Sequence, residues 1–98
     1  MIAYMALSLA GHDKNRLYMI MDETDTTVLL CDGKIRPIQK MKWKKKKHIQ
    51  LIKKIMNENL AERIRKQETV RDEEIKLALK QYQNRITMRD HTKIEGKE

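Results

Sequence analysis

The sequence predicts an α+β fold, a small β-barrel followed by a C-terminal helical hairpin, on three observations. Apolar residues alternate or cluster in short runs over residues 2–31, which is typical of strands. In the second half of the chain apolar residues recur at helical spacing. Between these parts, residues 33–57 contain ten basic residues and no acidic one. We expect residues 1–51 to form the barrel, including the basic segment, residues 52–86 two amphipathic helices, and residues 87–98 a frayed tail.

Length and composition support one small domain. The chain has 98 residues, of which 40% are hydrophobic and 37% charged, so the core is small. Four or five short strands leave exposed edges unless the sheet closes, which favours a barrel. A barrel of about 50 residues is marginal by itself. The helices are therefore expected to cover it.

Three strands are predicted in the first third of the chain. Residues 2–9 alternate with a period of two, and residues 17–21 form a continuous apolar run, which indicates burial of both faces. Residues 27–31 begin with β-branched side chains. The polar break at residues 11–16, which contains Gly and Asn, predicts a turn, and residues 22–25 form an acidic turn.

The pair Asp32-Gly33 favours a two-residue type I′ hairpin, in which both central residues have positive φ. Residues 34–36 would then return as a strand, ended by Pro37, which cannot donate to a ladder. Within the basic segment, residues 44–52 fit a strand, a helix or a linker. We favour a short strand at residues 47–51 that leads into the first helix.

Two helices are predicted after this strand. The first covers about residues 53–66 and has one apolar face. The second begins at Thr69-x-x-Asp72, which has the form of a capping box, and acidic residues on its first turn suit the helix dipole. Its apolar stripe consists of Ile75, Leu79, Tyr82 and Ile86.

The net charge of +8 comes almost entirely from the basic segment. Residues 1–32 contain two basic and five acidic residues, and residues 58–98 contain ten basic and nine acidic residues. The ten cations between them repel one another, and such a local excess is the electrostatic footprint of a surface that binds phosphates. A solvated linker is the alternative interpretation, because runs of like charge are often disordered.

Four motifs follow one another along the chain: ALSLAGHDKNR (residues 6–16), LCDGKIR (residues 30–36), the Lys-rich run that ends in His48, and the helical DEEIKLAL (residues 72–79). Their order and spacing resemble bacterial KOW-domain RNA-binding proteins, which are related to a large-subunit ribosomal protein of archaea and eukaryotes. The resemblance covers about residues 3–82. It implies an SH3-like barrel of the KOW type that binds structured RNA such as ribosomal RNA, and it favours the strand at residues 47–51.

The sequence departs from the family pattern at four positions. Asn15 stands where the family usually has the second Gly of its first turn, and Asn is the residue other than Gly that best tolerates a left-handed conformation. Ala3 stands where a Gly is common. Leu9 and His12 replace residues that are often basic, which reduces the positive charge of the first turn.

We expect RNA to bind through the basic segment and the first turn. Arginine matches phosphate geometry in a bidentate manner, whereas the lysines supply affinity and steering without base specificity. A base can stack on Trp43 if its indole is exposed; the alternative is that Trp43 covers the junction between barrel and helices. The predicted RNA-binding residues are Lys14, Arg16, Lys34, Arg36, Lys40, Lys42, Trp43, Lys44, Lys45, Lys46, Lys47 and His48.

The sequence indicates neither an enzyme nor a cofactor site. His12 and Asp13 are adjacent, which rarely lets one orient the other, and His48 has no second ligand at metal-binding spacing. No glycine-rich phosphate loop is present. Cys31, as the only cysteine, cannot form an internal disulfide, and its apolar surroundings predict a small buried residue. We expect no metal, no cofactor and no small-molecule substrate.

The N-terminus lacks the basic region of a signal peptide, and no stretch approaches the roughly 20 apolar residues of a membrane span. The expected protein is therefore a cytoplasmic RNA-binding module, associated with the ribosome and translation, without membrane contact. Two alternatives remain open. One is an adaptor that binds a protein partner, or itself, through the C-terminal helices. The other is DNA binding through the same lysines, which the residues alone do not separate from RNA binding.

Overall fold

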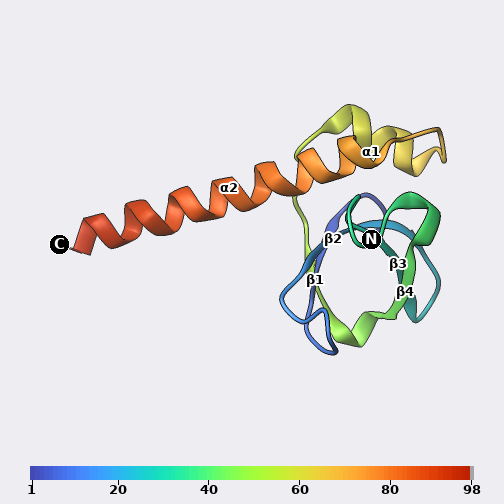
Figure 1. Cartoon of the computed structure of the whole chain (residues 1–98), viewed down its shortest axis with the longest axis horizontal. Coiled ribbons are helices and arrows are strands. Elements are labelled where there is room, and N and C mark those ends of the chain that lie inside the picture. The colour runs from blue at the N-terminus through green and yellow to red at the C-terminus, as the bar shows by residue number, and fades with distance from the viewer. Residues whose placement is uncertain (98) are drawn as a thin grey trace.

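A computed structural model describes the backbone of residues 1–97 and the side chains of residues 1–86. One antiparallel sheet has the strand order β4-β3-β2-β1-β5, and two helices follow it (Figure 1). This confirms the α+β class and the order of sheet and helices. The elements are β1 (Met5–Ser8), β2 (Leu17–Glu23), β3 (Thr27–Cys31), η1 (Ile38–Lys40), β4 (Lys42–Lys45), η2 (Lys46–His48), β5 (Ile49–Ile52), α1 (Glu58–Arg65) and α2 (Asp72–Lys97).

The sheet is strongly curved, and its two edge strands are β4 and β5 (Figure 1). β5 returns across the sheet to pair with β1, where Leu7 is opposite Gln50. The short helix η2 connects β4 to β5. No backbone ladder joins these two strands, so the pairing does not confirm closure into a barrel.

Two apolar clusters hold the fold together, one on each face of the sheet. Tyr18 and Ile20 lie in the first cluster with Val28 and Leu30 of β3. Alternate residues of β2, such as Met19, lie in the second cluster, against the helices. Both faces of β2 are therefore buried, which explains why residues 17–21 are continuously apolar.

The helices pack on the second cluster through the apolar faces that the sequence predicts. Leu60 and Ile64 of α1 and Ile75 and Leu79 of α2 are all buried. The start of α1 differs from the prediction, because residues 53–57 are not helical. The Asn57 side chain accepts from the backbone N–H of Leu60 at 3.0 Å, a cap that fixes the first turn of α1 at Glu58.

The predicted capping box at Thr69 is wrong. α2 begins at Asp72, and the Glu74 carboxylate accepts from the backbone N–H of Arg71 at 3.1 Å. Asp72 instead accepts from the backbone N–H of Ile38 at 2.8 Å, so its carboxylate anchors α2 to a distant loop. The Glu74 carboxylate also accepts from the Arg63 guanidinium, which ties α1 to α2. In the described backbone α2 continues as a helix to Lys97, whereas the sequence predicts a frayed tail over residues 87–98.

The predicted type I′ hairpin at Asp32-Gly33 is also wrong. Of the two central residues of the turn, Gly33 has positive φ, at +76°, but Asp32 does not, and residues 34–36 form no strand. The Asp32 carboxylate accepts from the backbone N–H groups of Lys34 and Arg36, each at 2.8 Å, and thereby folds them into a loop. This side-chain bonding competes with strand pairing. The fourth strand consequently forms at Lys42–Lys45.

The turn between β1 and β2 has the conformation that the sequence predicts, because Asn15 has φ of +73°. Asn15→Gly should be neutral or stabilising, since Gly adopts this region without a Cβ clash. Asn15→Ala should lower the free energy of unfolding by about 1 kcal/mol. Urea melts of both variants measure this difference, and equal stability of the two would contradict the assignment of the turn.

Candidate nucleic-acid interface

The basic segment contributes a strand whose lysines alternate between the two faces of the sheet. In β4, Lys44 is opposite Val28 and Lys42 is opposite Leu30, both fully buried residues. Paired residues share a face of the sheet, so Lys42 and Lys44 lie on the inner face. Lys45 and Trp43 consequently lie on the outer face, and Trp43 is 49% exposed.

The inner lysines converge on Asp13, which is 7% exposed in the turn between β1 and β2. Lys44 Nζ donates to Oδ1 of Asp13 at 2.7 Å, and Lys42 Nζ donates to Oδ2 at 3.1 Å. Ser8 Oγ donates to Oδ1 and the Tyr18 hydroxyl to Oδ2, each at 2.9 Å. Four donors thus surround one carboxylate, and they connect the first turn to β4. We call this group the Asp13 cluster.

The Asp13 cluster keeps its carboxylate ionised. Burial by itself raises the pKa of Asp13, but donation from Lys44, Lys42, Ser8 and Tyr18 outweighs it and holds the pKa well below its usual range. Burial, together with the bond to Asp13, raises the pKa of Tyr18 to about 12. Lys44, whose side chain is 9% exposed, therefore neutralises a buried charge inside the protein and is not available to phosphates in this conformation. Lys42 also bonds to Asp13, but its side chain is 31% exposed.

The outer face of β4 and the following helix η2 form the first candidate surface. A hollow of about 480 Å³ is lined by Lys45, Lys46 and Lys47 together with Asp25 and Thr26. Lys46 Nζ bonds to Glu23 at 2.8 Å. Among the described side chains Lys45 and Lys47 form no ion pair and are exposed. Trp43, at the edge strand, is accessible beside them.

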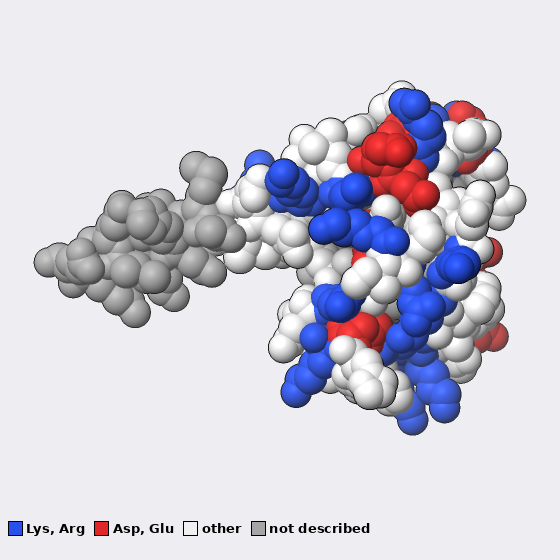
Figure 2. All heavy atoms as spheres, viewed as in Figure 1, with Lys and Arg blue, Asp and Glu red and all other residues white. Residues whose placement is uncertain are grey.

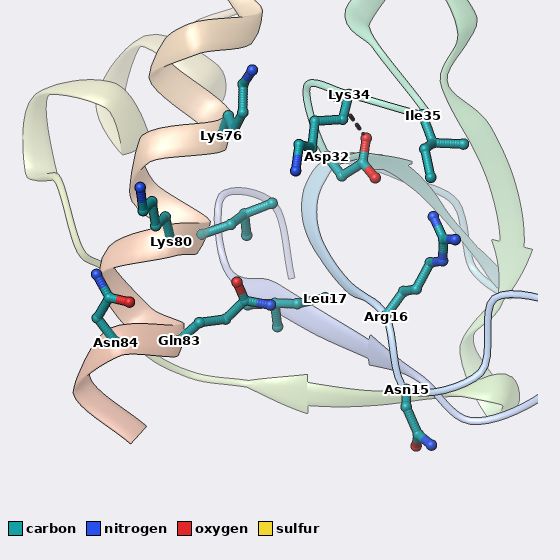
Figure 3. Close-up of a pocket in the computed structure, with 11 residues that line it drawn as sticks. Asn15, Arg16, Leu17, Asp32, Lys34, Ile35, Lys76, Lys80, Gln83 and Asn84 are labelled. Atoms are coloured by element: carbon teal, nitrogen blue, oxygen red, sulfur yellow. Dashed lines mark hydrogen bonds between the residues drawn. The ribbon is translucent and has the colours of Figure 1, made fainter. Parts of the chain in front are cut away.

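A second surface is a groove of about 740 Å³ between α2 and the loops that flank β1, β2 and β3 (Figure 3). Four cationic side chains line it, two from the loops and two from the helix: Arg16, Lys34, Lys76 and Lys80. Figure 3 shows the Lys34 side chain extending from its loop toward α2. We call this site the α2 groove.

The rest of the α2 groove is amide and apolar. Gln83 and Asn84 of α2 line it, and the Gln83 side chain points toward Leu17 in Figure 3. Leu79 and Ile35 add apolar surface. The remaining lining residues are Asn15 and Asp32, whose Oδ1 accepts from two backbone N–H groups of its own loop. The groove is therefore positive overall and contains amides that can donate and accept hydrogen bonds.

The predicted binding residues do not form one surface. Arg16 and Lys34 lie in the α2 groove, and Lys42 and Lys44 lie in the Asp13 cluster. Figure 2 shows that basic side chains cover both the helical part and the sheet part of one face, with acidic side chains in small groups. Exposed Lys14 lies on the first turn and exposed Lys40 in η1, while Arg36 and His48 are partly buried.

Sequence reasoning missed Asp13 and the two lysines of α2. Asp13 lies among polar turn residues, so its hydropathy does not indicate burial. The inner lysines Lys42 and Lys44 have the same hydropathy as the outer lysines, so the sequence does not distinguish the two groups. Lys76 and Lys80 are four residues apart, on a helix whose charges balance overall. Their spacing, which places them on one face, was the available signal.

In sequence comparisons, no protein-family model matches this chain, and no curated protein matches it. Within the described residues, no cluster of three or more His, Cys, Asp or Glu side chains could hold a metal ion. None of the helices in that part of the chain combines the length and the apolar character needed to cross a membrane.

Proposed function

We propose that this protein is a non-enzymatic, cytoplasmic RNA-binding module built on an SH3-like barrel of the KOW type. The order of the motifs in residues 6–48 supports membership of this family. The barrel is supported by the pairing of β5 with β1 and by the short helix η2, which connects β4 to β5. Structured RNA, such as ribosomal RNA, is the proposed partner.

The observation that carries the proposal is the outer face of β4. Trp43 is half exposed, and Lys45 of the same strand and Lys47 of η2 have no ion-pair partner among the described side chains. A strand with exposed ammonium groups beside an accessible indole suits a nucleic-acid backbone whose unpaired bases can stack. Such cations repel one another in the free protein, and phosphates relieve the repulsion.

We expect RNA binding that weakens steeply with salt. If about six cations neutralise phosphates, a plot of log K against log salt concentration should have a slope of about −4 to −5. Lys45→Gln together with Lys47→Gln should reduce the slope by about 1.5, because two phosphate contacts are lost. Both side chains are exposed, so the melting curve should not change. Fluorescence anisotropy with a ribosomal RNA fragment measures the slope.

A flat salt response would remove the proposal. A DNA fragment of the same sequence is the control for the class of nucleic acid, since only RNA offers the 2′-hydroxyl. Equal affinity for both would favour general binding of nucleic acid.

The second candidate function is an adaptor that binds a protein through the helices. The observation in its favour is Leu77 of α2, which is 55% exposed. Under this function the Lys45 and Lys47 variant keeps its partner, whereas Leu77→Gln loses it.

A further inference from the structure

We propose that the α2 groove holds a single-stranded RNA segment of about one or two nucleotides, with Lys76 and Lys80 on one wall and Arg16 and Lys34 on the other. A volume of about 740 Å³ lies in the range of sites for ligands of nucleotide size. The inference rests on the proposed function and identifies a second part of the interface, formed by a helix that the basic run does not include.

The positive charge of the α2 groove favours binding of an anion. Its four cations come from both walls, and none of them forms an ion pair among the described side chains. Among the described side chains, the only acidic one in the lining is Asp32, whose Oδ1 is already bonded to two backbone N–H groups. Cations that line one groove without a carboxylate partner raise the local concentration of phosphates.

The arrangement along α2 suits a strand of RNA. Lys76 and Lys80 are separated by one helical turn, a rise of about 6 Å. Their ammonium groups can therefore contact successive positions of a backbone. A duplex keeps its bases stacked inside, whereas a single strand can turn a base into a groove.

The remaining lining residues suit a base. Ile35, which is 58% exposed, offers apolar surface, and the exposed Gln83 and Asn84 amides can pair with base edges. Among the described residues, the hollow at the outer face of β4 and η2 has no Asn or Gln side chain in its lining. The α2 groove is consequently the part of the interface that can prefer one base over another.

The groove wall is held in place by contacts of the first two turns of α2. Asp72 accepts from the backbone N–H of Ile38, and Ile75 and Leu79 are buried against the sheet. Because the wall is already fixed, a bound strand does not have to order it.

The test is a pair of double variants that each remove two exposed charges. Lys76→Gln with Lys80→Gln changes the groove, and Arg65→Gln with Lys66→Gln on α1 is the control, since neither residue lines the groove. The probe is a mixed-sequence single-stranded RNA of about ten nucleotides. The groove variant should bind about ten-fold more weakly than the control, and its salt slope should be about 1.4 smaller than that of the unmodified protein.

The melting curve of the groove variant should match that of the unmodified protein. The control loses the exposed Lys66–Glu62 ion pair, so its melting temperature should fall by no more than about 3 °C. Replacing Gln83 and Asn84 with Ala should reduce the preference among homopolymers and leave the salt slope unchanged. If the groove variant binds as tightly as the control while the unmodified protein binds RNA, the groove assignment fails and the proposed function stands. If the unmodified protein binds neither this probe nor the ribosomal fragment, the proposed function itself fails.

Discussion

Replacing Asp13 with Ala should lower the free energy of unfolding by about 3–5 kcal/mol, because it leaves the largely buried ammonium group of Lys44 without its carboxylate. The Lys44 side chain is 9% exposed, so water compensates little of this loss. The hydroxyl groups of Ser8 and Tyr18 also lose their acceptor. For a domain of this size, such a loss is a large part of the total stability.

Lys44→Met should cost less than Asp13→Ala, because the carboxylate keeps Lys42, Ser8 and Tyr18 as donors. The double variant Asp13→Ala with Lys44→Met should lose less stability than the sum of the two single losses, because it leaves neither the Asp13 carboxylate nor the Lys44 ammonium group buried without its partner. Asp25→Ala is the matched control: Asp25 is exposed and its removal should change stability by less than about 0.5 kcal/mol. Equal urea melts for Asp13→Ala and Asp25→Ala would show that the cluster does not stabilise the fold.

The pH dependence of stability has a defined sign. The pKa of Asp13 is lower in the folded protein than in the unfolded chain. Its contribution is therefore fully present above the unfolded pKa of about 4 and is lost as the pH falls toward the folded pKa. Glu23 behaves in the same way, since bonds to Lys46 and the N-terminus lower its pKa to about 2. In Asp13→Ala the decline of stability between pH 4 and pH 2 should be smaller.

Periodicity identified the elements that bury apolar side chains. The strand at residues 27–31 and the stripe of α2 agree with the structure because burial determines which residues are apolar there. The Lys-rich strand β4 was not predicted as a strand at residues 42–45. Its inner positions carry lysines that a distant Asp13 neutralises, so the alternation of faces leaves no hydropathy signal.

The α2 groove could not be predicted because it is made by tertiary contacts. Asp32-Gly33 has the local signature of a hairpin, but the Asp32 side chain bonds to its own loop and Gly33 lies against the first turn of α2. These contacts bring Lys34 and Lys76 to one groove. Local sequence rules describe a turn and a helix separately, and the site exists only where they meet.

Gly33→Ala should destabilise the protein by about 2–4 kcal/mol and also weaken RNA binding. Gly33 has φ of +76°, which disfavours any Cβ, and a Cβ built there would overlap the carbonyl oxygen of Asp72. It would also lie 3.2 Å from the backbone nitrogen of Lys76. Because the obstacles are backbone atoms, relief requires movement of the first turn of α2. That movement would displace Lys76 and stretch the bond from Ile38 to Asp72.

Gly11→Ala separates the two causes of destabilisation, the strain of positive φ and the overlap of a Cβ with the backbone of α2. Gly11 also has positive φ, at +88°, but a Cβ there would meet only side-chain atoms, Asp13 Oδ1 at 3.5 Å and Lys44 Nζ at 3.6 Å. It should therefore cost only the conformational strain, about 1 kcal/mol. Urea melts compare the stabilities, and anisotropy with the single-stranded RNA probe, below the melting temperature of both variants, compares binding. Gly11→Ala should keep the affinity of the unmodified protein, while Gly33→Ala should match the loss seen for Lys76→Gln with Lys80→Gln. If the two glycine variants are equally stable, the first turn of α2 does not pack against Gly33, and this contact does not fix the wall of the groove.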